Sequence, residues 1–206
     1  MENPIVRAYA NRSAEYAERF ASLSATHPSD RALVAAWARG LHGEVVDAGC
    51  GPGQWTAFLH DAAADASLVR GLDPVPEFID LARAGHPELG FAVGAVEELV
   101  VAPGSLGGVL AWYSLIHHQP SELPSALNAL FQALSPGGQL LAGFFDHPGG
   151  TEPERFDHAV IAAYCWPAKA FAERLEAAGF LIAETHSRTS GESRPHAAIW
   201  AHKPGG

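Results

Sequence analysis

The segment from position 47 to position 53 reads Asp-Ala-Gly-Cys-Gly-Pro-Gly and most constrains how this 206-residue chain can fold. A short apolar strand, 44–48, precedes it, and a helix with Trp55 and Leu59 on one face is predicted to follow. Closely spaced glycines between a strand and a helix let the chain turn sharply and let a ligand approach the backbone. The N-terminus of the following helix favours an anionic group such as a carboxylate. The segment therefore predicts a ligand-binding loop.

Asp73 is the second feature that points to a ligand. It ends the next predicted strand, 68–73, and lies 24 residues after Gly49. In nucleotide-binding α/β proteins a carboxylate at this place accepts hydrogen bonds from both hydroxyls of a ribose. The alternative is that Asp73 only caps the turn before Pro74 and Pro76. The spacing between the loop and the acid favours ribose binding.

The loop departs from the dinucleotide-binding pattern Gly-x-Gly-x-x-Gly, because Gln54 stands at the place of the third glycine. Pro52 also removes one backbone N–H from the region where a pyrophosphate is bound. We therefore expect the ligand to be an adenosine compound without a diphosphate.

Alternating apolar runs and amphipathic stretches from about residue 30 predict βαβ units, and hence an α/β fold with a largely parallel sheet. The predicted strands are 44–48, 68–73, 91–93, 109–112, 139–145, 180–185 and 197–201, with a turn at 136–138. The predicted helices are one amphipathic helix from Tyr9 to Leu23, one capped by Ser29-Asp30 and ending at Gly40, and others over 55–62, 76–82, 121–134 and 171–178.

Composition bears on partners and location. The formal net charge is −10 and the basic residues are scattered, which argues against a nucleic-acid substrate. Apolar runs stay shorter than the ~18 residues of a membrane helix. Because charges precede any apolar stretch at the N-terminus, we expect a cytoplasmic protein. Cys50 and Cys165 are isolated and show no zinc-ligand spacing, so neither a disulfide nor a bound metal is expected.

Taken in order, these segments resemble the class I S-adenosylmethionine-dependent methyltransferases, particularly the small single-domain bacterial group. The matching segments are 45–53 for the first motif, 72–73 for the second-strand acid, 94–99 for the adenine-contacting segment, 110–118 for the fourth-strand segment, and 134–138 and 175–180 for two later turns. Two positions depart from the pattern. Ala95 stands where the family usually has an acid that binds the adenine amino group, and Gly107-Gly108 stand where an acid often opens strand four.

The resemblance implies a Rossmann-like seven-stranded sheet that is mostly parallel with an antiparallel last strand, helices on both faces, and an N-terminal helical lid. It implies one methyltransferase domain over 1–206, made of a helical cap over 1–42 and an α/β core over 43–206. The implied cofactor is S-adenosylmethionine, and the product is S-adenosylhomocysteine. The implied cofactor-binding residues are Tyr9, Tyr16, Asp47, Gly49, Cys50, Gly51, Asp73, Pro74, Ala95, Val96, Glu97, Trp112 and Tyr113.

The chemistry needs a general base only when the acceptor atom must lose a proton; otherwise the protein aligns the reactants and excludes water. His117, and less so His118, are candidates because they follow the strand-four segment near the expected cofactor mouth. His147, beside Asp146 after strand five, is another candidate. For each, the alternative is a histidine in an ordinary polar loop.

The expected acceptor is a small molecule methylated on O, N or S, and the expected assembly is a monomer or a homodimer. Methyltransferases acting on amino groups of nucleic bases resemble each other in an Asn/Asp-Pro-Pro-aromatic motif after strand four, whereas positions 112–115 read Trp-Tyr-Ser-Leu. Two alternatives stay open. One is an NAD-dependent oxidoreductase, although the chain lacks a Tyr-x-x-x-Lys pair; the other is a protein that binds S-adenosylmethionine without catalysis.

Overall fold

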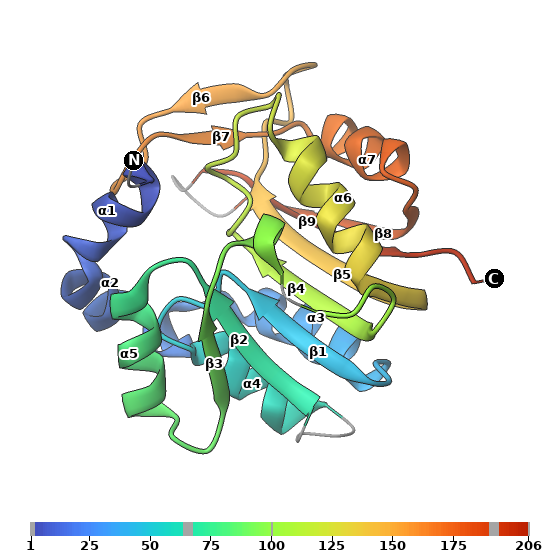
Figure 1. Cartoon of the computed structure of the whole chain (residues 1–206). Helices are drawn as coiled ribbons and strands as arrows, with labels where there is room; N and C mark the ends of the chain where they lie inside the picture. The colour runs from blue at the N-terminus through green and yellow to red at the C-terminus, as the bar shows by residue number, and fades with distance from the viewer. Residues whose placement is uncertain (1–2, 64–67, 100, 190–193, 206) are drawn as a thin grey trace.

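A seven-stranded sheet forms the centre of the protein in the computed structural model, which describes residues 3–63, 68–99, 101–189 and 194–205 (Figure 1). The strand order is β3-β2-β1-β4-β5-β9-β8, and of these strands β9 alone runs antiparallel to its neighbours. The strands are β1 Glu44–Ala48, β2 Val69–Asp73, β3 Gly90–Val93, β4 Leu106–Trp112, β5 Leu134–Phe145, β8 Leu181–Arg188 and β9 His196–His202. The predicted Rossmann-like sheet with an antiparallel last strand is confirmed.

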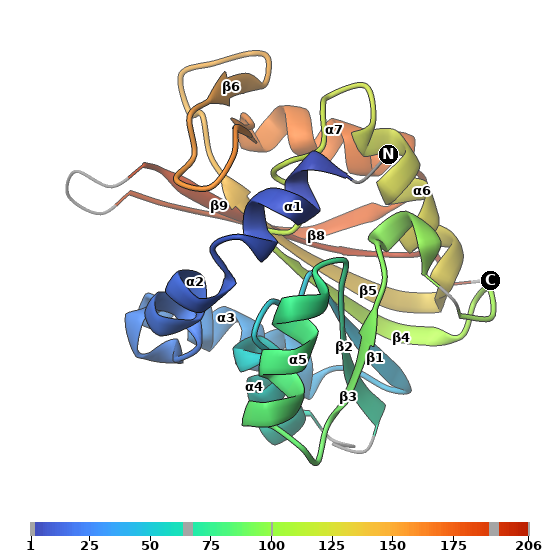
Figure 2. The same ribbon diagram turned by 60° about the vertical axis from the view of Figure 1, so that its left-hand side comes forward.

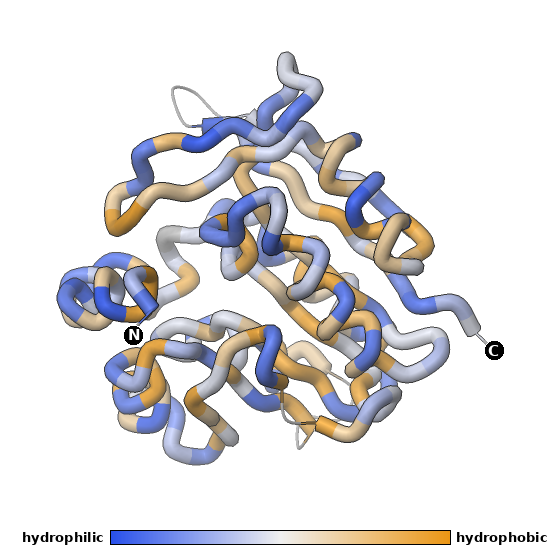
Figure 3. Tube along the Cα trace, turned by 45° about the horizontal axis from the view of Figure 1, so that its top comes forward, coloured by the Kyte–Doolittle hydropathy of each residue, from blue (hydrophilic) through white to orange (hydrophobic). Residues whose placement is uncertain are grey.

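Helices cover both faces of this sheet. On one face α3 (Pro28–Arg39) and α4 (Gln54–Ala62) pack against β1, β2, β4 and β5. Helix α5 (Pro76–Gly85) lies on the same face and packs on Phe91 of β3. On the other face α6 (Leu123–Ala133) and α7 (Ala168–Ala177) bury their apolar sides. Figure 3 shows hydrophobic residues concentrated along the central strands. No helix among the described residues is long and apolar enough to cross a membrane.

The N-terminal segment differs from its prediction. Instead of one helix over 9–23, the chain forms α1 (Pro4–Ala10), α2 (Ser13–Phe20) and a 3-10 turn, η1 (Leu23–Ala25). The break lies at Arg12, whose φ of −125° is not helical and whose guanidinium bonds both Glu15 and the carbonyl of Ala159. Of these two partners only Ala159 comes from a distant segment, and the apolar periodicity of 9–23 does not mark the break.

Two other boundaries also differ. Helix α3 begins at Pro28 and is capped by His27, whose ring nitrogen accepts from the N–H of Ser29. Asp30, predicted as part of the cap, instead makes two hydrogen bonds to Arg188 on β8. Strand β5 starts at Leu134, before the predicted turn, because Leu134 already pairs with Leu106 of β4.

A small hairpin, β6 (Glu154–Phe156) and β7 (Ala163–Cys165), was not predicted from the sequence. Its connecting segment, 157–162, lies next to the N-terminal helices (Figures 1 and 2), where the Arg12 guanidinium bonds Ala159. The hairpin strands are only three residues long, too short for a pattern of alternating apolar residues.

Candidate active site

Backbone hydrogen bonds to β2 fix the glycine loop after β1. The N–H groups of Gly49 and Cys50 both donate to the carbonyl of Leu72, at 2.7 and 3.0 Å. Gly49 has a φ of +80°, and a Cβ built there would lie 2.2 Å from the Cβ of Ser114. Gly51, with a φ of +54°, would instead direct a Cβ into open space, its nearest neighbour being Tyr16 at 3.9 Å. Gly49 is therefore required for close approach to the end of β4, whereas Gly51 faces a cavity.

Asp73 lies at the carboxyl end of β2, opposite this loop. One carboxylate oxygen accepts the N–H of Gly51 and the other accepts the N–H of Val75, each at 2.9 Å. The side chain is 6% exposed, and burial raises its pKa to about 6 against the opposing effect of these two hydrogen bonds. Asp73 thus caps the turn, as the alternative interpretation expected, and also lines a cavity. Each oxygen keeps lone-pair capacity for a ligand.

That cavity, which we call the ribose-side cavity, has a volume of about 690 Å³, within the range of small-molecule sites. Its walls are formed in part by eleven of the thirteen residues expected to bind a cofactor: Tyr9, Tyr16, Gly49, Gly51, Asp73, Pro74, Ala95, Val96, Glu97, Trp112 and Tyr113. The 3-10 turn η3 (Val96–Glu98) follows β3 and supplies its far wall. The hydroxyl of Ser114, which also lines the cavity, is buried without a hydrogen-bond partner among the described residues. An unpaired polar atom at this position fits a polar ligand.

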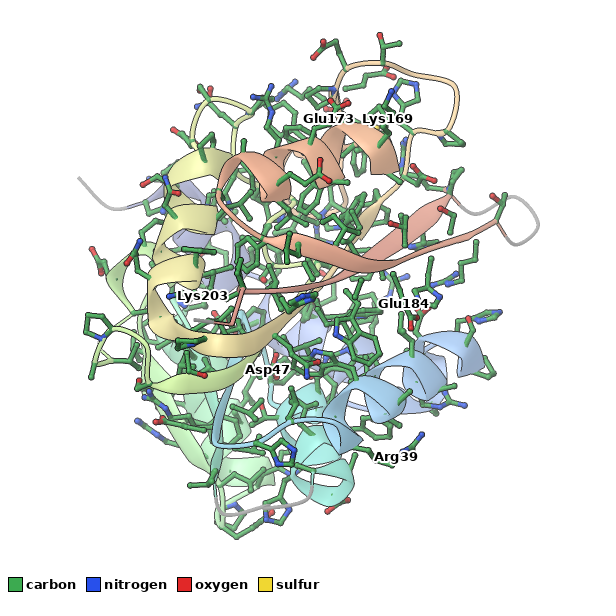
Figure 4. All side chains as sticks on the ribbon, turned by 90° about the vertical axis from the view of Figure 1, so that its right-hand side faces the viewer. Arg39, Asp47, Lys169, Glu173, Glu184 and Lys203 are labelled. Atoms are coloured by element: carbon green, nitrogen blue, oxygen red, sulfur yellow. The ribbon has the colours of Figure 1, made fainter. Side chains whose placement is uncertain are left out.

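Asp47 and Cys50 are the two expected residues outside the ribose-side cavity. Asp47, labelled in Figure 4, is 1% exposed and accepts a 2.7 Å hydrogen bond from the hydroxyl of Thr56 on α4. Asp47 lines neither the ribose-side cavity nor the smaller cavity beside it, so it supports the glycine loop from the side away from both cavities. Cys50 lines a second cavity, but its thiol group packs with Phe91, Ile79 and the α5 side of the fold.

Burial raises the pKa of Asp47 to about 7, above the ~3.9 of an unfolded aspartate. The native state then binds more protons than the unfolded state between these values, so this group contributes stability at low pH that is lost as pH rises toward 7. In Asp47→Asn, we expect a smaller fall in Tm between about pH 5 and about pH 8 than in the wild type, measured by scanning calorimetry. The exposed Asp61→Asn on α4 serves as control. Identical pH dependence in Asp47→Asn and the wild type would contradict this assignment.

The lid contact joins Tyr9 of α1 to His117. The Tyr9 hydroxyl lies 2.7 Å from Nε2 of His117, and Nδ1 of the same ring lies 3.0 Å from the carbonyl of Ala162. A carbonyl only accepts, so we assign the ring proton to Nδ1 and the Tyr9 O–H as donor to Nε2. Burial lowers the pKa of His117 and raises that of Tyr9. His117, the candidate base, is therefore neutral, and the lone pair on its Nε2 accepts the hydrogen bond from the Tyr9 hydroxyl of α1.

His118 and Glu97 both line the ribose-side cavity and are hydrogen-bonded to each other. Nε2 of His118 lies 2.6 Å from Oε1 of Glu97, and this hydrogen bond lowers the pKa of the Glu97 carboxyl group. The contact ties the loop after β4 to η3. It also means that a ligand contacting the Glu97 carboxylate shares it with His118.

A second cavity of about 390 Å³, which we call the edge cavity, adjoins the first and shares Tyr9, Tyr16, Gly49, Trp112 and Tyr113 with it, among others. Its own wall comes from strand ends that are neighbours in register: Phe145 pairs with His196, and His196 pairs with Arg188. The Tyr113 hydroxyl bonds Nδ1 of His196. The sequence analysis missed Arg188 and His196, which are strand ends that meet only in the sheet, and His158, which lies between β6 and β7. No local pattern marks any of the three.

Tyr113 is the one non-glycine residue of the described chain with a positive φ, +60°. Such a conformation is uncommon for a bulky residue and is found where surrounding structure imposes it. Here the phenol ring contacts Trp112, Phe145 and His196. These contacts hold the ring in spite of the strained backbone, and Tyr113 lines both cavities.

His147 corrects a prediction. It lines neither cavity, because the loop after β5 turns it toward the β6–β7 hairpin, where its Nε2 lies 3.5 Å from Oε2 of Glu154. Its neighbour Asp146 accepts the N–H of His147 and that of Ala168, the first residue of α7. Asp146 thus orders a turn and a helix start instead of orienting a base.

Known proteins resemble this chain over part of its length. Residues 45–138 match the family described as "Methyltransferase domain". The malonyl-acyl-carrier-protein O-methyltransferase of Erwinia billingiae is 37% identical over 98 residues, which cover 48% of this chain and 37% of that protein. The chain spans about two fifths of the length of the curated relatives it matches.

Two solved structures share the fold over nearly the whole chain. The 4+2-cyclase SpnF aligns with a TM-score of 0.80 and 17% identity over 98% of this chain and 96% of that one. The 1,6-didemethyltoxoflavin-N1-methyltransferase of Burkholderia thailandensis, with bound 1,6-didemethyltoxoflavin and S-adenosylhomocysteine, aligns with a TM-score of 0.72 and 21% identity over 99% and 92%. Residues 45–138 are therefore similar in sequence to a methyltransferase domain, and nearly the whole chain shares the fold of these two solved structures.

Proposed function

We propose that this protein binds S-adenosylmethionine and transfers its methyl group to O, N or S of a small-molecule acceptor. The observation that carries the proposal is the Asp73 carboxylate, fixed by two backbone N–H groups and facing the ribose-side cavity. Asp73 would hold the ribose, and Gly49 and Gly51 would lie against the methionine part. When bound, the cofactor supplies an electrophilic methyl group.

The loop geometry argues against the alternative of an NAD-dependent oxidoreductase. Gly49 and Cys50 donate their N–H groups to Leu72, Gly51 donates to Asp73, and Gly53 donates to Cys50. Pro52 has no N–H. The backbone donors of residues 49–53 are therefore used inside the protein, and none is left to bind a pyrophosphate.

We assign the acceptor to the edge cavity, where aromatic rings of Trp112, Tyr113 and Phe145 accompany polar groups. Tyr9 and Tyr113 line this cavity, and the hydroxyl of each is hydrogen-bonded to a histidine, Tyr9 to His117 and Tyr113 to His196. If the acceptor must lose a proton, the tyrosine oxygen can accept it while passing its own proton to the histidine. Named acceptors among relatives and structural neighbours include malonyl-acyl-carrier protein and 1,6-didemethyltoxoflavin, which supports a metabolite-sized acceptor group.

The test is calorimetric titration of the purified chain with S-adenosylmethionine, S-adenosylhomocysteine and NAD, followed by incubation with methyl-labelled cofactor and candidate acceptors. We expect micromolar binding of both sulfur nucleosides, no binding of NAD, and label transfer to at least one small molecule. Binding of NAD, or of neither nucleoside by folded protein, would refute the proposal. Tight nucleoside binding without transfer would favour a binding protein or another reaction on this fold, since SpnF is named a cyclase.

A further inference from the structure

Three side chains with the chemistry of metal ligands meet at the base of the β6–β7 hairpin, outside both cavities. Glu154 and Cys165 are direct cross-strand partners, so their side chains leave the hairpin on the same face. His147 reaches them from the loop after β5. One nitrogen, one carboxylate oxygen and one sulfur from these residues all lie within 4.8 Å of one another.

The spacing of the first two atoms fits a tetrahedral zinc ion. With zinc bonds of about 2.1 Å to nitrogen and oxygen, the tetrahedral angle holds the two ligand atoms about 3.4 Å apart. The separation between Nε2 of His147 and Oε2 of Glu154 is 3.5 Å. A set of one imidazole, one thiolate and one carboxylate favours Zn²⁺ over Mg²⁺ or Ca²⁺, which prefer oxygen alone.

The surroundings hold these ligands in place. The backbone N–H of His147 donates to the Asp146 carboxylate at 2.8 Å and to the carbonyl of Trp166 at 3.1 Å. Cys165 is buried, and its thiol donates to the carbonyl of Glu154 at 3.4 Å. Glu154 is exposed, so water can reach the fourth coordination position of an ion bound here. On binding, the thiol would release its proton to solvent and the sulfur–metal bond would form.

We propose that His147, Glu154 and Cys165 bind one Zn²⁺ ion with water as the fourth ligand. This departs from the sequence-based expectation of no metal, and it does not depend on the proposed function. A bound Zn²⁺ ion would affect the segment 157–162 between the two strands. This segment supplies His158 to the edge cavity and the Ala162 carbonyl that fixes His117. Zinc would join both strands at their base and thereby stabilise this wall of the cavity.

The experiment uses the full chain, freed of metal with a chelator and titrated with Zn²⁺ by calorimetry and with Co²⁺ by absorption spectroscopy. We expect one equivalent of Zn²⁺, a rise in Tm that chelator reverses, and a thiolate-to-cobalt charge-transfer band. Cys165→Ser should lose the band, and Glu154→Gln, on an exposed side chain, should weaken Zn²⁺ binding at least about tenfold.

Two matched variants control for the other cysteine and for an exposed histidine–carboxylate pair. Cys50→Ser should keep the cobalt band, and His186→Gln should leave Zn²⁺ binding unchanged, because His186 pairs with Glu184 at 2.8 Å with no cysteine beside them (Glu184 is labelled in Figure 4). The proposal fails if the wild type shows no cobalt band, or if Glu154→Gln binds Zn²⁺ as tightly as the wild type. Should Cys165→Ser not fold, the Glu154→Gln comparison decides.

Discussion

Asp73→Ala is expected to weaken binding of S-adenosylmethionine and S-adenosylhomocysteine by at least about 100-fold, because two hydrogen bonds from ribose hydroxyls to a charged acceptor contribute ~1.5–3 kcal/mol each. The variant also removes the acceptor of the Gly51 and Val75 N–H groups, so the loop loses part of its support. Calorimetric titration measures the affinity. Asp80→Ala, on the exposed side of α5, is the matched control and should bind normally.

The pKa of Asp73 adds a second readout. Burial raises this pKa to about 6, and the ionised form is the better acceptor for the ribose hydroxyls. Affinity in the wild type should therefore fall as pH decreases below about 6, approaching about tenfold per pH unit, because binding then releases a proton. Asp73→Ala should lack this component. A wild-type affinity that is unchanged across this range, or an Asp73→Ala variant that binds normally, would exclude Asp73 as the ribose ligand.

The two loop glycines should separate binding from folding. Gly49→Ala is expected to destabilise the protein by about 2–5 kcal/mol, because alanine is strained at a left-handed φ and its Cβ would overlap the Ser114 side chain. Gly51→Ala carries only the conformational cost of about 1–2 kcal/mol, since its Cβ meets nothing closer than Tyr16 at 3.9 Å. That Cβ would occupy the cavity, so affinity for S-adenosylmethionine should fall at least about tenfold in a folded protein.

Denaturant unfolding and calorimetric titration together measure both effects. Gly85→Ala is the control for a glycine-to-alanine change, because the site lies at the end of α5, has open space around it and does not have a positive φ. It should leave affinity unchanged and keep or slightly raise stability. If Gly51→Ala binds as tightly as the wild type, the ligand does not lie against this side of the loop.

The sequence predicted the parts of the site that depend on local order along the chain. The loop and Asp73 follow consecutive strands, and the carboxyl ends of neighbouring parallel strands meet at one edge, so their proximity follows from the alternation of elements. Tyr9 and Tyr16, predicted to bind the cofactor from one continuous helix, line both cavities from two separate helices, α1 and α2. The break between these helices lies at Arg12, whose guanidinium bonds the carbonyl of Ala159, 147 residues away.

The predictions that failed or were missing concern contacts between distant segments. His147 and His117 both lie in loops that follow strand ends. His147 turns away from the cavities toward Glu154 of the hairpin, whereas His117 turns toward the ribose-side cavity, and only the course of the chain decides this difference. The pairs Tyr113–His196 and Asp30–Arg188 are separated by 83 and 158 residues, and no local pattern connects them.

The sequence by itself determined the α/β class and the sheet with its antiparallel last strand, and it predicted eleven of the residues that line the ribose-side cavity. These depend on hydrophobic periodicity, on glycine conformation and on motif spacing, which act over a few tens of residues. Only the tertiary structure decided the edge cavity, the state of His117 and the His147–Glu154–Cys165 cluster. The geometry of these three features arises only when strand ends and loops from both halves of the chain pack together. Contacts with residues that are far apart in the sequence then fix the positions of the side chains.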